Sequence, residues 1–493
     1  MKQYSSFLFT GYSWNHHAGK ISLRYSLDHS IDFEETILLP EPVSDERLKA
    51  REWEIERALA ALHLIGGISY YKTCLPRKIE IPEGTLSKQE AKFWNMVYER
   101  GLGEFFYRND IDFRGLVNFP VNEQPLAENK LNRLKPKTKN QKPISEQRIL
   151  VPIGGGKDSL VTIELLKKAG AKVTLLRMGS HPLIDELAHV TGLPMITVRR
   201  SLSGNLFDLN EEGALNGHVP ITAYLSILSL LLAELYAFDT VVMSNEASAS
   251  IGNIEFKGTE INHQWSKSLE FEKMLRSYAR ETIGTNVEYF SLLRPFSELK
   301  IAEIFSHSPQ YFEHFTSCNT NWKILSLTPA CRQAGLPPLP ARTESVRSGG
   351  PEGEGLHRED GAAMNRSGAT GSWCGNCPKC AFVFSALAAF LPRQTLEQIF
   401  GKILYDDATL LPLFRELLGQ EKFKPFECVG TPDETKAAFL LARKRGDLRD
   451  TAAMKMFEAE ILPTINDPEK LIEDCLKPNT KHCLPKEFVS LVS

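Results

Sequence analysis

Short apolar runs alternate with helical segments between residues 148 and 290, and this alternation constrains the fold more than any other feature of the chain. The runs occupy residues 148–153, 172–176, 195–198, 240–243 and 287–290. Apolar runs of this length are typical of strands that are buried on both faces. Strands that alternate with helices at this spacing form a parallel sheet with helices on both faces. We therefore predict an α/β fold with a parallel, doubly wound sheet, whose ligands bind beyond the carboxyl ends of the strands.

The segments before the predicted sheet differ from it in pattern. Residues 1–121 combine strand-like alternation with two helical stretches, at 44–64 and 87–100, each opened by a serine that can cap a helix. We expect them to form an N-terminal α+β domain. Residues 122–147 are rich in lysine, arginine and proline. A flexible basic linker explains them better than a nucleic-acid-binding arm does, because no aromatic residues are interleaved.

The predicted sheet domain covers residues 148–324, and two further segments follow it. Residues 325–372 are rich in glycine and proline and show little apolar periodicity, which is typical of a disordered insertion. Residues 373–493 begin with a cysteine cluster and continue in a helical pattern. We expect helices there at 397–404, 410–418 and 434–445.

Composition excludes several classes of protein. With 58 basic and 61 acidic residues, the net charge is −3, so no global positive field draws the chain to nucleic acid or an anionic membrane. The longest apolar stretch, 220–238, contains Glu234 and polar residues, so we predict a buried helix and no membrane span. The first residues lack the pattern of a signal peptide, and nine cysteines in so long a chain do not form a disulfide scaffold. We expect a cytoplasmic protein with reduced thiols and no obligate protein partner.

Three consecutive glycines stand between the first strand and the next helix, in Ile153-Gly154-Gly155-Gly156-Lys157-Asp158-Ser159. Glycines let the backbone turn tightly, and amides at a helix N-terminus bind anions such as phosphate. Lys157 adds a mobile positive charge, Asp158 could hold a magnesium ion or cap the helix, and Ser159 can donate to a phosphate oxygen. The spacing is neither that of a Walker loop nor that of a dinucleotide-binding loop. The alternative is a glycine-rich turn into a capped helix, which the strand and helix on either side make less favoured.

This loop resembles the PP-loop of the N-type ATP pyrophosphatases, usually Ser-Gly-Gly-x-Asp-Ser, which split ATP and place AMP on a substrate oxygen. Residues 217–222 and 294–300 agree with that family's layout, as a second phosphate-side loop and as the segment after the last strand. The resemblance implies an ATP site with magnesium on Asp158 and with His218 near the phosphates, although His218 could equally be an ordinary residue at a helix start. The loop residues of that site would be Gly154, Gly155, Gly156, Lys157, Asp158 and Ser159. Gly154 replaces the usual serine, so one hydroxyl contact is missing or is replaced by an amide.

Cysteines form the second constellation. Two residues separate Cys374 from Cys377 and Cys377 from Cys380, a spacing that suits a soft metal ion. A fourth ligand is needed, and Cys318 is the candidate; Cys331 lies inside the predicted insertion and is less favoured. We predict a zinc site, because several PP-loop enzymes carry a similar cluster after the ATP core. An iron–sulfur cluster and metal-free packed thiols are the alternatives.

A narrower resemblance covers most of the chain. The glycine loop and residues 102–107, 244–249, 317–322 and 373–384 are similar to the UDP-N-acetylmuramoyl-L-alanyl-L-glutamate epimerases, also called glycopeptidyl-glutamate epimerases. That resemblance implies ATP-dependent inversion of the terminal L-Glu to D-Glu through an acyl adenylate, with Lys157 and Asp158 acting on ATP and magnesium. Activation as an adenylate removes the carboxylate charge that otherwise opposes loss of the α-proton. The substrate would be a small molecule, and no nucleic acid or membrane is expected.

The proton-transfer residues are the least constrained part of this hypothesis. Asn245 and Glu246 follow a strand whose carboxyl end should face the site, so Asn245 could bind substrate and Glu246 could bind substrate or magnesium or act in catalysis. Helix capping by Asn245 and a solvated Glu246 are equally compatible with the sequence. Glu255 and His263 lie downstream in a predicted loop, and nothing in the sequence distinguishes either as a base.

Other functions share parts of this pattern. An enzyme that resembles 7-cyano-7-deazaguanine synthase would have the ATP loop and the cysteine cluster but would not need the large N-terminal region. A transfer-RNA thiolation enzyme would be expected to show a basic face and sulfur-carrying cysteines. A nucleotide-binding module without catalysis would bind ATP and not turn it over.

Overall fold

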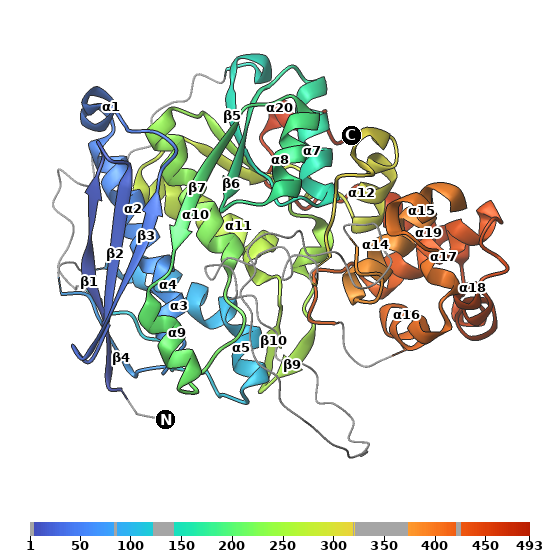
Figure 1. Ribbon diagram of the computed structural model, residues 1–493, viewed down its shortest axis with the longest axis horizontal. Coiled ribbons are helices and arrows are strands. Elements are labelled where there is room, and N and C mark those ends of the chain that lie inside the picture. The colour runs from blue at the N-terminus through green and yellow to red at the C-terminus, as the bar shows by residue number, and fades with distance from the viewer. Residues whose placement is uncertain (1–3, 83–85, 122–141, 319, 321–372, 421–424) are drawn as a thin grey trace, which may run out of the picture.

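The computed structural model describes residues 4–82, 86–121, 142–318, 320, 373–420 and 425–493 (Figure 1). Within this part of the chain, nine strands form one sheet in the order β11-β8-β5-β6-β7-β3-β2-β1-β4. Their bounds are β1 Ser6–Asn15, β2 Lys20–Leu27, β3 Ile31–Leu38, β4 Lys78–Glu80, β5 Arg148–Pro152, β6 Lys172–Met178, β7 Met195–Ser201, β8 Thr240–Met243 and β11 Glu288–Ser291. A separate antiparallel hairpin consists of β9 (Ile254–Phe256) and β10 (Thr259–Ile261).

Five of these strands, β11, β8, β5, β6 and β7, are parallel to their neighbours within that group, as the alternation predicts. The chain runs from β5 to β6 and β7 on one side, then crosses to β8 and β11 on the other side. The order therefore reverses between β5 and β8. In open α/β sheets this switch point is where the carboxyl ends of the strands leave a crevice for ligands.

Side chains of β5 alternate between two cores, which explains the helices on both faces. Ile149 and Val151 join one core with α7 (Lys157–Lys168), α8 (Pro182–Thr191) and α12 (Glu298–Phe305). Leu150 joins the opposite core with α2 (Glu52–Gly66) and α10 (Ile221–Tyr236). This alternation confirms the predicted α/β sheet with helices on both faces.

The N-terminal strands extend the same sheet, which the sequence did not predict. β1, β2 and β3 form an antiparallel meander, and β3 pairs antiparallel with β7. In Figure 1 the blue N-terminal strands and the green parallel strands form one continuous surface. Strands from the expected N-terminal domain, residues 1–121, and strands from the segment after it therefore belong to one sheet.

The predicted helices are mostly present, with two differences in their bounds. Ser44 caps α1 (Asp45–Ala50) and Ser87 forms a capping box on α4 (Lys88–Gly101), but the first predicted helix is interrupted at Arg51 before α2. The helix predicted at 397–404 is α15 (Arg393–Phe400), which ends early because Gly401 adopts a left-handed φ of 74°. The other helices are α3 Ile68–Tyr71, α5 Gly103–Arg108, α9 Gly204–Glu211, α11 Leu269–Tyr278, α14 Pro378–Ala388, α16 Leu411–Leu417, α17 Pro432–Arg445, α18 Ala452–Met456, α19 Pro468–Leu476 and α20 Lys486–Val489.

The apolar helix predicted at 220–238 is α10, and twelve of its sixteen residues are buried against the sheet and α2. Across the described residues, no helix combines the length and the apolar character needed to span a membrane.

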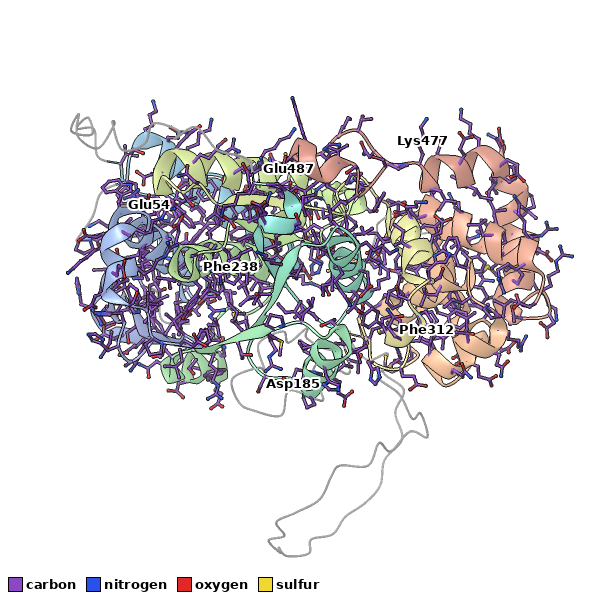
Figure 2. All side chains as sticks on the ribbon, turned by 90° about the horizontal axis from the view of Figure 1, so that it is seen from above. Glu54, Asp185, Phe238, Phe312, Lys477 and Glu487 are labelled. Carbon is purple, nitrogen blue, oxygen red and sulfur yellow. The ribbon has the colours of Figure 1, made fainter. Side chains whose placement is uncertain are left out.

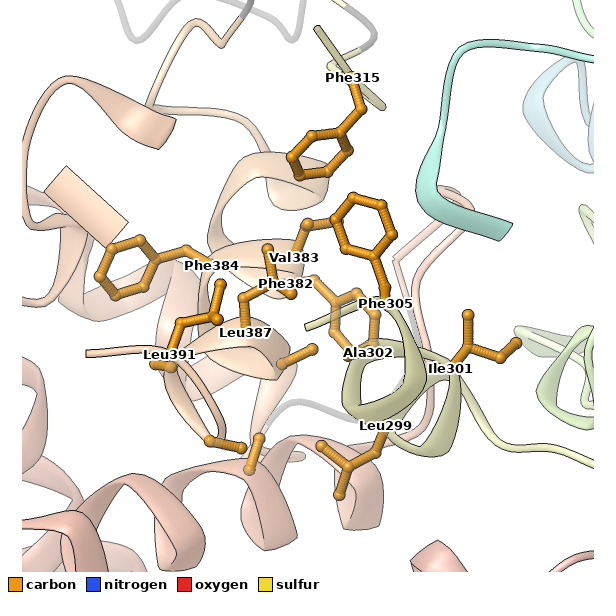
Figure 3. Close-up of a cluster of buried hydrophobic side chains, with 14 of the residues drawn as sticks. Leu299, Ile301, Ala302, Phe305, Phe315, Phe382, Val383, Phe384, Leu387 and Leu391 are labelled. Carbon is orange, nitrogen blue, oxygen red and sulfur yellow. The ribbon is translucent and has the colours of Figure 1, made fainter. Parts of the chain in front are cut away.

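The C-terminal helices pack on the parallel half of the sheet through α12. Figure 3 shows Phe305 of α12 and Phe382 of α14 pointing toward one another, and both are buried. In Figures 1 and 2 these helices lie at the end of the molecule opposite the N-terminal meander. The predicted insertion at 325–372 and residues 122–141 of the predicted linker lie outside the described residues.

Candidate active site

The glycine loop lies at the switch point, after β5, and leads into α7. Gly155 adopts a left-handed φ of 84°, which side chains other than glycine rarely tolerate. A Cβ at Gly156 would lie 2.8 Å from Ser317 Oγ, so a larger residue there would force the Ser317 hydroxyl to move. The helix begins at Lys157. Lys157, Asp158 and Ser159 therefore occupy the first turn of the helix, where the amides are free to bind anions.

Three carboxylates meet beside this helix start. Asp158, Glu246 and Glu298 bring their oxygens within 4.8 Å of one another. Glu246 follows β8 across the switch point, and Glu298 begins α12. The sequence prediction that Asp158 and Glu246 lie at one edge of the sheet agrees with this geometry, whereas Glu298 was assigned no role.

Lys157 is held inside this acidic cluster rather than being mobile. Its side chain is 2% exposed, and its Nζ donates to Asp158 Oδ1 at 2.5 Å and to Glu298 Oε2. Burial lowers the pKa of Lys157, but the two carboxylates raise it by more. The net effect is a raised pKa, so Lys157 remains protonated. Burial and the neighbouring carboxylates of Asp158 and Glu246 raise the pKa of Glu298 against the opposing effect of Lys157. Three carboxylates around one lysine leave negative charge in excess, and a divalent cation can bind there if it takes over contacts that Lys157 now makes with Asp158 and Glu298.

Arg294 fixes the loop that carries Glu246. Its side chain is 1% exposed and forms an ion pair with Glu272 at 3.0 Å. It also donates to the backbone oxygens of Glu246 and Lys267, each at 2.6 Å. The backbone of Asn245 bonds to Ser291 Oγ, so Asn245 is held between β8 and β11. Arg294 thereby holds two loops of the site at fixed positions.

A second cluster joins segments that are distant in the chain. Glu104 of α5 is 1% exposed and bonds to His263 Nδ1 and to Arg108 Nε, the latter at 2.5 Å. His218 lies 3.6 Å from the same carboxylate, and its ring centroid is 4.5 Å from that of His263. His218, expected near the ATP phosphates, therefore contacts this second cluster.

Cys428, from the loop before α17, completes the second cluster. Its Sγ lies 3.3 Å from Lys267 Nζ, and it is close enough to His263 to raise the pKa of that imidazole. Glu104 and the two histidines could in principle hold a metal ion. The adjacent Arg108 and Lys267 oppose a bound cation, so we interpret the cluster as a network of ion pairs.

The four cysteines singled out by the sequence lie together. Cys318, Cys374, Cys377 and Cys380 have their sulfurs within 4.8 Å of one another. The Sγ atoms of Cys374 and Cys380 are 3.6 Å apart, and those of Cys377 and Cys380 are 3.5 Å apart. Sulfurs on a tetrahedral zinc ion, with bonds of about 2.3 Å, lie about 3.8 Å apart. The donor set therefore fits zinc, and the sulfurs are too far apart for disulfides. Cys331 lies outside the described residues.

A cavity of about 660 Å³ adjoins the loops that Arg294 fixes. Its lining includes Arg100, Lys273 and Lys481, together with Trp265 and Asn262. Glu260 and Glu270 also line it, and Glu270 accepts a hydrogen bond from Trp265 Nε1 at 2.6 Å, so the lining carries both charges. No sequence pattern predicted this cavity, because its lining comes from separate segments.

The fold and the site together define a class of protein. A glycine loop, a helix N-terminus and three carboxylates meet at the switch point of a doubly wound sheet, as in α/β proteins that bind phosphorylated ligands there. Comparison with known families then identifies the lineage. The model of the MurL N-terminal domain matches residues 1–292, and that of the MurL C-terminal domain matches residues 362–471. The chain belongs to the MurL family.

Three relatives with assigned names match nearly the whole chain. A protein of Xanthomonas oryzae pv. oryzae is 36% identical over 487 residues, which cover 98% of this chain and 96% of the relative. A protein of Micromonospora sp. is 33% identical over 100% of this chain and 99% of its own length, and one of Salinispora tropica is 35% identical over 91% and 87%. Each is named UDP-N-acetyl-alpha-D-muramoyl-L-alanyl-L-glutamate epimerase.

Proposed function

We propose that this chain is an epimerase that inverts the terminal L-Glu of UDP-N-acetyl-α-D-muramoyl-L-alanyl-L-glutamate to D-Glu during synthesis of peptidoglycan precursors. The names of the full-length relatives support this substrate and this reaction. We further propose that the reaction consumes ATP and forms AMP and pyrophosphate through an acyl adenylate.

The main support for the ATP step is the acidic cluster of Asp158, Glu246 and Glu298 beside the glycine loop. ATP would bind with its phosphates at the amides that begin α7, next to Asp158, Glu246 and Glu298. These three carboxylates would hold magnesium, which prefers oxygen ligands and neutralises phosphate charge. Lys157 already lies between two of them and would share the stabilisation of the leaving pyrophosphate.

Adenylation explains why an epimerase needs ATP. Removal of the α-proton from a free carboxylate would place a second negative charge beside the first. An acyl adenylate has no such charge, and its carbonyl accepts the electron pair left by the proton. A base removes the proton, an acid returns one on the opposite face, and water then releases AMP and product.

The four cysteines would hold a structural zinc ion. Cys318 follows the parallel sheet and Cys374, Cys377 and Cys380 begin the C-terminal region, so a shared ion would join the two. Such a closed thiolate site would contribute to folding and not to the reaction.

Turnover in deuterium oxide tests the proposed reaction. The purified chain is incubated with the UDP-muramoyl dipeptide ending in L-Glu, ATP and magnesium. We expect a product that ends in D-Glu with deuterium at the α-carbon, and AMP in proportion to turnover. AMP without α-deuteration would contradict the epimerase, and epimerisation without ATP would contradict the adenylate.

A further inference from the structure

The cluster around Cys428 has no role in the ATP step or in the proposed zinc site. It brings a cysteine, a lysine, a histidine and a carboxylate together: Lys267 Nζ lies 3.3 Å from Cys428 Sγ, and the nearby His263 bonds to Glu104. Glu104, which holds His263, is 1% exposed, whereas Cys428 is partly exposed. His263 and Lys267 are partly exposed as well, so the cluster has one buried end, at Glu104, and Cys428 lies toward its partly exposed side.

The electrostatics favour the thiolate form of Cys428. Burial opposes ionisation of the thiol, but Lys267, His263 and Lys379 together lower its pKa well below the ordinary value. Burial lowers the pKa of His263, but Cys428 and Glu104 raise it by more, to about 9. Glu427 is the acidic neighbour, and its own pKa is raised by burial. A thiolate beside a protonated imidazole is a stronger base and nucleophile than a thiol.

Two lysines connect this sulfur to the carboxylates on the glycine loop. Lys267 interacts electrostatically with Cys428 and also with Glu246 and Asp158. Lys379 interacts with Cys428 and also with Asp158 and Glu298. Arg294 donates to the backbone oxygens of both Lys267 and Glu246, so the segment beside Cys428 and the loop that carries Glu246 are held together.

We propose that Cys428 exchanges the α-proton on one face of the adenylated glutamyl residue, with His263 and Glu104 as positioning residues. This inference rests on the function proposed above. The Cα–H bond breaks as an S–H bond forms, and the electron pair moves into the carbonyl of the adenylate. A second, protonated group on the opposite face returns a proton to the α-carbon. The thiol then loses its proton to solvent, and the cycle needs no oxidant or reductant.

Separate assays of the two half-reactions test this role. We expect Cys428→Ala and the nearly isosteric Cys428→Ser to form AMP at a rate close to that of the unchanged protein. α-Deuteration in deuterium oxide should fall by roughly 100-fold or more, because general acid–base catalysis contributes at least that factor. Cys483→Ser, a partly exposed cysteine in the C-terminal tail, serves as the control with both activities intact.

The outcomes separate the two proposals. If the unchanged protein shows no ATP-dependent α-deuteration, the proposed function fails. If the unchanged protein deuterates the substrate and both Cys428 variants do so equally well, only the role of Cys428 fails. A covalent adduct of the glutamyl group on Cys428, detected by mass spectrometry, would also contradict proton exchange by this sulfur.

The pH dependence of alkylation tests the positioning residues. Iodoacetamide should modify Cys428 rapidly at pH values well below the ordinary thiol pKa, because the thiolate is already present. His263→Gln removes one cation, so the onset of rapid alkylation should move to higher pH. The facing groups Lys267, Lys379, Glu104 and Glu427 remain in that variant. An unchanged onset would contradict the role of His263.

Discussion

Glu298 shows what the sequence could not establish about single residues. Lys157, Asp158 and Glu246 could be found because each lies in the short segment that follows a predicted strand. Glu298 lies 141 residues from Lys157, within a segment that resembled the PP-loop family but suggested no role. Glu104 and Cys428 are likewise brought to His263 only by the fold. Contacts of this kind have no local signal, because they depend on which loops the sheet places together.

Asp158→Asn tests the site at this scale. The amide keeps the size of the side chain but loses the charge that would hold magnesium. We expect the fold to persist and AMP formation to fall by roughly 100-fold or more, because metal ions supply several kcal/mol of transition-state stabilisation. The measurement is AMP release at saturating ATP and magnesium. Asp208→Asn, an exposed position on α9, is the matched control. An Asp158→Asn protein with normal AMP release would place the ATP site elsewhere.

At the scale of elements, local chemistry predicted most boundaries. Ser44 and Ser87 cap the helices that they were expected to begin, and Gly192 ends α8 in the left-handed conformation. The pairing of β3 with β7 could not be predicted, because strand pairing depends on side chains far apart in the sequence. A buried ion pair marks that junction. Arg200 of β7 donates twice to Glu35 of β3, each bond at 2.8 Å.

Arg200→Met tests how much this junction contributes to stability. Glu35 is fully buried and also accepts from Tyr224 at 2.8 Å, while the Arg200 guanidinium lies 3.8 Å from the centroid of that ring. Loss of the arginine leaves a buried carboxylate without its cation, which costs roughly 3–5 kcal/mol. Denaturant unfolding should show this loss, and Arg199→Met, exposed on the same strand, should change stability little. In the double variant, Glu35→Gln removes the buried charge as well and should recover part of the lost unfolding free energy. If it recovers none, the loss in Arg200→Met does not come from burying an unpaired charge.

At the scale of the molecule, the sequence correctly predicted an α/β core followed by a helical C-terminal region. It did not predict that the C-terminal region contributes to the site. Glu434 of α17 accepts from the backbone amide of Glu298 at 2.8 Å and from Ser248 Oγ at 2.6 Å. The match to the MurL N-terminal domain ends at residue 292, one residue beyond β11, so that unit contains every strand of the large sheet.

Removal of a cysteine tests the proposed metal link between these regions. We expect about one zinc ion per purified chain. Cys377→Ser should lose it and unfold at lower denaturant concentration, because binding free energy of a structural metal is folding free energy. Elemental analysis and unfolding curves provide the measurements, with Cys74→Ser as the control. If the purified wild-type protein contains no metal, the zinc site is wrong. Visible charge-transfer absorption would indicate an iron–sulfur cluster instead.

The pairing of β3 with β7 also has a consequence for how the chain is made. Glu35 and Arg200 are 165 residues apart, so β3 leaves the ribosome long before its partner does. At about 5–20 residues per second, the outer edge of β3 would stay open on the order of 10–30 s. Open strand edges invite pairing with other chains. Asp32 and Glu34, both exposed on β3, place negative charge on that strand during the interval. The acidic face of this strand would then protect the nascent protein from aggregation, in addition to any effect in the finished one.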